Sequence, residues 1–185
     1  MTLFNQYFAV TVCGLLLNML VSFQLHAHMM VAQHGTLNLK GNGVFMVLSL
    51  PITAFNGIDD DNDGKLSVAE FNSHKPMIAK AVNENVVLSD QHGKRLLQGM
   101  MLSPVTSHHI STPSDDSTAS QIVIMGRFSL ADDSENLQYQ VSLFGNSSDE
   151  KLMKITATHE KHGKTQAFEL TPENTIAHLF SEENN

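Results

Sequence analysis

Alternating apolar and polar residues run through most of the chain and predict β-strands. The two clearest runs cover residues 31–40 and 44–50, with Gly41-Asn42-Gly43 between them. Glycine and asparagine tolerate the positive φ angles of tight turns, so this arrangement predicts a β-hairpin. The other predicted strands are bounded by turn-forming residues and cover 86–90, 95–105, 121–130, 137–145, 151–159 and 165–170. About eight strands at this spacing predict a mainly β fold, an antiparallel β-sandwich.

A short helical insertion is expected after the second strand. Ser67 and Glu70 have the spacing of a capping box, in which each side chain accepts a hydrogen bond from the other residue's backbone amide. Apolar residues then repeat at helical spacing as far as Asn85, but Pro76 interrupts the pattern. We therefore predict two short helices or one kinked helix over residues 67–85.

The amino-terminal segment differs in composition from the rest of the chain. Residues 8–23 are almost continuously apolar, which is short for a membrane span and typical of a signal-peptide core. We expect residues 1–27 to be a signal peptide cleaved after Ala27, and residues 28–185 to form a single domain. An uncleaved anchor is the alternative. The sole cysteine, Cys13, has no lipoprotein cleavage box before it, so no lipid anchor is expected.

Composition narrows the range of ligands. The chain has 185 residues, 42% of them hydrophobic, which disfavours a wholly disordered protein. The formal net charge is −8, and the 11 Lys and Arg residues are scattered without forming a basic stripe. This distribution excludes nucleic acid as the principal partner and makes a cation the expected ligand.

An acidic loop after the second predicted strand has the donors that a hard cation requires. Residues 59–70 read Asp-Asp-Asp-Asn-Asp-Gly-Lys-Leu-Ser-Val-Ala-Glu. Calcium takes about six to eight oxygen ligands, and a loop wound around the ion directs alternate side chains inward. Gly64 would occupy the sharp turn. The predicted metal ligands are carboxylates of Asp59, Asp61 and Asp63, the backbone carbonyl of Lys65, Ser67 through a water molecule, and both carboxylate oxygens of Glu70.

At these positions the chain resembles the EF-hand calcium-binding family, over residues 55–71. EF-hand loops usually occur two to a domain. The other adjacent aspartates of this chain, at 115–116 and 132–133, lack the alternating acidic residues and the closing glutamate of a second loop. The resemblance thus implies a single structural Ca²⁺ site of the weak extracellular class rather than a conformational switch. The layout is also similar to periplasmic segments of HupE/UreJ-type bacterial proteins, which favours a periplasmic or secreted location.

Histidines offer an alternative metal chemistry. If cleavage follows Ala27, His28 presents a free amine and an imidazole, and His34 or His109 could complete a copper or zinc site. His159 and His162 span a predicted strand end and its turn, where the two rings need not converge, and we interpret them as a solvated pair.

The sequence contains no nucleophile elbow, phosphate-binding loop or dinucleotide-binding motif. We therefore expect an exported, non-catalytic calcium-binding protein. The alternatives are a copper or zinc carrier, or an accessory domain for an envelope membrane-protein partner.

Overall fold

The computed structural model describes residues 32–106, 118–132 and 134–181. These residues form ten β-strands in two sheets, one α-helix and three short 3₁₀ turns. The larger sheet has the strand order β5 (Leu97–Thr106), β6 (Ala119–Ser129), β2 (Gly43–Pro51), β1 (His34–Lys40), β8 (Met153–His159) and β9 (Lys164–Leu170). The smaller sheet has the order β10 (Ile176–His178), β7 (Gln138–Val141), β3 (Val86–Asp90) and β4 (Gly93–Arg95). The helix is α2 (Val68–Asn85), and the 3₁₀ turns are η1 (Ile52–Ala54), η2 (Ser148–Lys151) and η3 (Glu160–His162).

The first hairpin matches the sequence prediction. β1 and β2 pair in antiparallel register with Lys40 opposite Gly43, which leaves Gly41 and Asn42 as the turn. Gly41 has a φ of 55°, in the left-handed region where a side chain is strained. The predicted turn chemistry is therefore confirmed.

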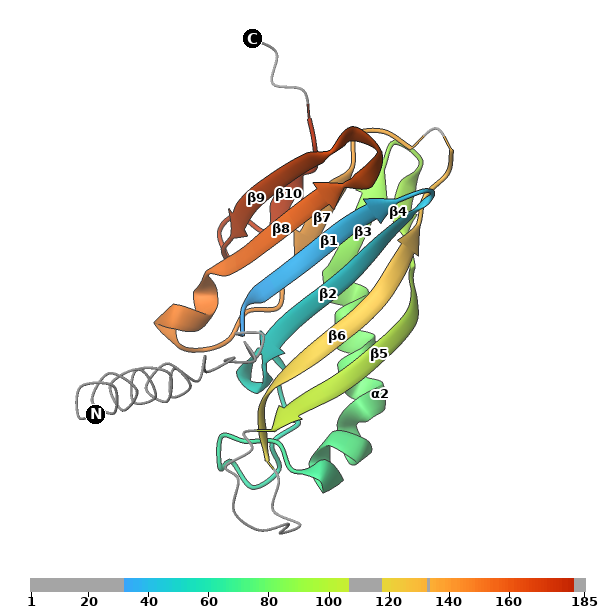
Figure 1. The fold of residues 1–185 in the computed structure, drawn as a ribbon. Helices are drawn as coiled ribbons and strands as arrows, with labels where there is room; N and C mark the ends of the chain where they lie inside the picture. The colour runs from blue at the N-terminus through green and yellow to red at the C-terminus, as the bar shows by residue number, and fades with distance from the viewer. Residues whose placement is uncertain (1–31, 107–117, 133, 182–185) are drawn as a thin grey trace, which may run out of the picture.

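Helix α2 and the smaller sheet cover the same face of the larger sheet, with the helix behind the β5 and β6 side (Figure 1). The inward-facing residues of all these elements join in one hydrophobic core. On β2, for example, Met46 and Leu48 are buried while the intervening Val47 is partly exposed and Phe45 is 45% exposed. The mainly β class is confirmed. The second layer contains a helix as well as the smaller sheet, and the β-sandwich stays a prediction.

One pair of strands is parallel, which contradicts the predicted fully antiparallel arrangement. β8 lies parallel to β1, with His34 opposite Lys154 and Leu39 opposite His159. Parallel neighbours require a long crossover connection. Between β1 and β8 the chain passes through strands of both sheets, so no local pattern could have indicated this pairing.

Several predicted strand boundaries were also wrong. The predicted strand over 95–105 is divided at Leu96, which is 80% exposed, so that β4 joins the smaller sheet and β5 the larger. β7 ends at Val141 instead of residue 145, β8 begins after η2, and the three-residue strand β10 was not predicted. The described residues consequently contain ten strands where about eight were expected.

The helical insertion is in the predicted place but forms one continuous helix. Pro76 lies inside α2, where it lacks the amide that would donate to the carbonyl four residues earlier. The helix continues because Phe71 before the proline and Ile78 and Val82 after it are all buried against the core. Packing on both sides thus outweighs one missing hydrogen bond.

Some sequence predictions concern residues outside the described ranges. The signal peptide over residues 1–27, the mature amino terminus at His28 and the copper ligand candidate His109 all lie there. Among the described residues, no helix has both the length and the apolar character needed to cross a membrane.

Candidate metal site

The acidic loop lies between η1 and α2, and one residue before it and one within it are buried in the core. Ile58, just before the loop, and Leu66 within it are each 1% exposed, while most residues between them are exposed. The backbone turns at Asn62, with a φ of 59°, and at Gly64, with a φ of 78°. Asparagine and glycine are the residues that most readily adopt this conformation, so the turn predicted at Gly64 is present.

Three of the predicted ligands lie together. One carboxylate oxygen from each of Asp59, Asp61 and Asp63 lies within 4.8 Å of the other two. The amide of Gly64 donates to Asp59 Oδ2 at 2.9 Å, and the amide of Lys65 donates to Asp63 Oδ1 at 2.8 Å. The Asp63 amide is 3.2 Å from both Asp59 Oδ1 and Asp61 Oδ1. Backbone amides of the loop therefore orient all three carboxylates.

Ser67 and Glu70 form the predicted capping box at the start of α2. Ser67 Oγ accepts a hydrogen bond from the Glu70 amide at 3.2 Å, and Glu70 Oε2 accepts one from the Ser67 amide at 2.8 Å. Glu70 Oε1 accepts a further bond from the Asp60 amide at 2.8 Å, which links the end of the loop to its beginning. The hydrogen bonds from Ser67, followed by that from Asp60, lower the pKa of Glu70 to about 2.

The predicted ligands thus divide into two groups. The three aspartates form a close cluster, whereas the Glu70 carboxylate lies at the helix start, bonded to Ser67 and Asp60. The backbone amide of Lys65 donates a hydrogen bond to the Asp63 carboxylate. The metal-binding roles of the Lys65 carbonyl, Ser67 and Glu70 remain predictions.

The charge of the aspartate cluster suits a cation. A hydrogen bond from the Asp63 amide lowers the pKa of Asp61, but desolvation and the negative charges of Asp63 and Glu70 raise it, and the net effect is upward. Close carboxylates repel one another, and a bound cation would offset that repulsion. A donor set made only of oxygens fits a hard ion such as Ca²⁺ or Mg²⁺ better than a soft one.

No family model and no curated protein matches the chain. The resemblance to the EF-hand family therefore rests on the residues of this loop.

Backbone hydrogen bonds join the loop to the larger sheet, and the sequence did not predict them. The amide of Leu66 donates to the carbonyl of Ala119 at 2.8 Å, and the amide of Ala119 donates back to Leu66 at 2.8 Å. Ala119 is the first residue of β6, more than fifty positions along the chain. The loop is thereby joined to the start of strand β6 at its only buried internal position.

A second missed contact involves Asp60, which is not a predicted ligand. His74 Nε2 lies 2.9 and 3.0 Å from the two carboxylate oxygens of Asp60. His74 is on α2, so this contact joins the loop to the second turn of the helix that follows it. No short-range motif signals this pairing.

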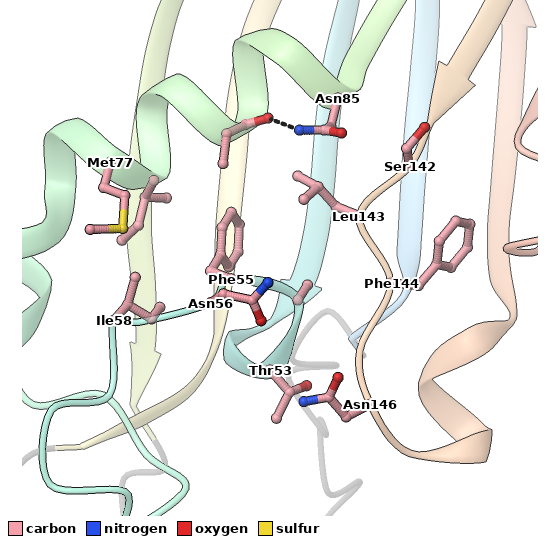
Figure 2. A pocket seen from close by; sticks show the side chains of 13 residues that line it. Thr53, Phe55, Asn56, Ile58, Met77, Asn85, Ser142, Leu143, Phe144 and Asn146 are labelled. Carbon is pink, nitrogen blue, oxygen red and sulfur yellow. Dashed lines mark hydrogen bonds between the residues drawn. The ribbon is translucent and has the colours of Figure 1, made fainter.

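A pocket of about 430 Å³ borders the loop between η1, α2 and the segment after β7 (Figure 2). Ile58 lines it from the base of the loop, Met77 from the helix, and Leu143 from the segment after β7. Its polar lining residues carry amide or hydroxyl groups, such as Asn85, whose side chain donates to the carbonyl of Ala81 at 2.9 Å. All described lining residues are uncharged at neutral pH.

The histidine candidates are distributed over several places. His34 Nδ1 lies 3.1 Å from the carbonyl of Ala32, at the start of β1. The rings of His159 and His162, in contrast, are in contact, with centroids 4.3 Å apart and an interplanar angle of 69°. The two rings thus converge, which the sequence did not require, while His162 is exposed and His159 is partly exposed.

Proposed function

We propose that the protein binds one Ca²⁺ ion in the loop over residues 59–70 and that the ion acts as a structural clip in an exported, non-catalytic protein. The observation that carries the proposal is the convergence of Asp59, Asp61 and Asp63, whose carboxylate oxygens lie within 4.8 Å of one another. Side chains of like charge come this close at a cost that a divalent cation offsets.

The proposed ligand set extends beyond the aspartate cluster. The Lys65 carbonyl, a water molecule on Ser67 and the Glu70 carboxylate would complete the coordination of a hard cation. The short connection from Asp60 to Glu70, 2.8 Å between amide nitrogen and carboxylate oxygen, supports a role for Glu70 because it holds both ends of the loop together.

The structural role is supported by what the loop connects. Helix α2 begins at Val68, within the last residues of the loop, and Leu66 is bonded through its backbone to Ala119 of β6. An ion bound by the loop would therefore connect the start of the helix and the start of strand β6 through the same group of ligands. Because such an ion binds only to the folded loop, it would stabilise the fold by mass action.

The exported location is proposed from the apolar segment over residues 8–23 and the cleavage position after Ala27. Amino-terminal sequencing of the protein recovered from cells tests the cleavage, and a chain that retains Met1 would contradict cleavage after Ala27 and favour the uncleaved anchor. A location outside the cytoplasm would supply the calcium concentration that a single weak site needs.

Calcium titration of the purified protein by calorimetry, combined with thermal unfolding, tests the proposed site. We expect one ion per chain with a Kd on the order of 10⁻⁴–10⁻³ M. At a free concentration ten times the Kd the stabilisation is about 1.4 kcal/mol, which corresponds to a rise in Tm of about 3–6 °C for a chain of this size.

Two variants make the test specific. Asp59→Ala combined with Glu70→Gln should abolish both the heat of binding and the rise in Tm. Asp60→Asn removes a negative charge from the same loop without removing a predicted ligand and should retain both. Calcium binding that survives the first variant would place the site elsewhere, and no uptake by the unaltered protein at tens of millimolar Ca²⁺ would refute the function.

A further inference from the structure

Two histidine rings that are three residues apart face each other at the end of β8. His159 is the last residue of β8 and the residue immediately before η3, and His162 is the last residue of η3. In a 3₁₀ turn, side chains at positions i and i+3 are eclipsed. The turn therefore places the two imidazoles on the same side of the chain, with their centroids 4.3 Å apart.

The turn is held in this shape by its own backbone. The Gly163 amide donates to the carbonyl of Glu160 at 3.3 Å, and Gly163 has a φ of 57°, a conformation that disfavours any residue with a side chain. Gly163 thus ends the turn directly after His162 and lets the chain return as β9.

His159 is also in contact with a second aromatic ring. The Phe180 ring lies against it with centroids 5.5 Å apart and an interplanar angle of 73°. Phe180 itself has a φ of 53°, and its amide donates to Gln166 Oε1 at 2.8 Å. A ring held by such contacts loses little conformational freedom when it binds a ligand.

The Nδ1 atom of His159 is buried and has no hydrogen-bond partner among the other described residues. A buried polar atom with no partner outside its own residue is unusual in a folded protein, which makes it a candidate metal ligand. Imidazole nitrogen is a ligand for zinc, copper and nickel ions.

The distance between the two ring centroids is close to that of two imidazoles on one ion. With metal–nitrogen distances of about 2.0–2.1 Å and an angle at the metal between a right angle and the tetrahedral value, the ring centroids are roughly 4.5–5.2 Å apart. The observed 4.3 Å requires only a small opening of the pair to reach this range.

The surroundings leave room for an ion and further ligands. Both rings line a pocket of about 650 Å³ between η3, β10 and the segment before β7. His178 of β10 and Glu135 also line it, while Lys164 contributes an opposing positive charge. Among the described residues only the aspartate cluster of the acidic loop brings three ligand atoms within 4.8 Å, so water or a rearranged side chain would complete the coordination here.

We propose that His159 and His162 form a binding site for a divalent transition-metal ion of the zinc type, separate from the acidic loop. The site uses neutral nitrogen donors, whereas the loop uses charged oxygen donors, so the two sites select different ions. This proposal does not depend on calcium binding by the loop.

Zinc titration by calorimetry, in calcium at a concentration that saturates the loop, tests the proposal. The unaltered protein should bind Zn²⁺ in the micromolar range. His159→Gln and His162→Gln should each weaken zinc binding by about tenfold or more. Even the loss of a residue that only hydrogen-bonds to a metal ligand lowers metal affinity by about 10–100-fold. His92→Gln, in the turn between β3 and β4 and outside this pocket, is the matched control and should leave the affinity within about twofold of the unaltered value.

Two further measurements keep the test decisive. If His159→Gln does not fold, as circular dichroism would show, the exposed His162→Gln variant decides the outcome. The Asp59→Ala, Glu70→Gln protein should retain zinc binding, which separates this site from the calcium loop. Zinc affinity that is unchanged in His162→Gln, or reduced equally in His92→Gln, would overturn the proposal.

Discussion

The carboxylate of Asp90 is the buried charge whose removal should change the stability of the fold most clearly. Its side chain is 0% exposed and receives hydrogen bonds from Arg95 Nε at 2.7 Å, Ser134 Oγ at 2.6 Å and the His92 amide at 2.9 Å. These donors tie the hairpin of β3 and β4 to the segment before β7, which also lines the histidine pocket.

Asp90→Asn should destabilise the protein by about 3–5 kcal/mol at pH 7, because it leaves the Arg95 guanidinium without its partner at a mostly buried site. Domains of this size have unfolding free energies of about 5–15 kcal/mol. The loss is therefore a large fraction of the total and is measurable by urea denaturation.

The effect should depend on pH in a defined direction. Burial raises the pKa of Asp90, but the hydrogen bonds from Ser134, Arg95 and the His92 amide outweigh it and hold the pKa below its usual value. The ionised carboxylate thus contributes stability above its unfolded pKa of about 3.9, and this contribution is lost as the pH falls through the lower folded pKa. The difference in unfolding free energy between wild type and Asp90→Asn should accordingly be smaller at pH 3 than at pH 7.

Asp149→Asn is the control, because Asp149 is exposed and the substitution should change stability by no more than about 0.5 kcal/mol. A destabilisation by Asp90→Asn of less than about 1 kcal/mol, or one that is equal at pH 3 and pH 7, would refute the assigned role of the buried carboxylate.

Two further variants examine how the acidic loop is attached to the fold. Ser67→Ala removes the hydroxyl of the capping box and should cost about 1 kcal/mol in thermal unfolding without calcium; a Tm unchanged from wild type would contradict the role of the cap. Leu66→Ala leaves the backbone bridge to Ala119 in place but removes a side chain that is 1% exposed, and it should cost about 2–5 kcal/mol in urea denaturation. Val68→Ala is its control, since Val68 is 51% exposed and its truncation should cost far less.

The elements that were predicted correctly depend on interactions between close neighbours in the sequence. The turn at Gly41 and Asn42 and the capping box of Ser67 and Glu70 each involve residues within a few positions of one another. The same holds for the aspartate cluster, because a tight loop directs alternate side chains inward and so places their carboxylates near each other.

The contact between His159 and His162 was not predicted, for a local reason. The two residues were placed at a strand end followed by an irregular turn, whereas the chain forms a 3₁₀ turn that eclipses positions three apart. A short 3₁₀ turn has no apolar periodicity of its own, so the pattern of polar and apolar residues does not reveal it.

By itself, the sequence determined the mainly β character of the described chain, its first hairpin, the position of its helix and the close grouping of the three loop aspartates. Only the tertiary structure decided that β8 lies parallel to β1, that Leu66 bonds to Ala119 and that Phe180 packs on His159. The physical reason is the range of the forces involved. Turn and cap preferences act over a few residues, whereas these three contacts depend on how one shared core brings distant segments together.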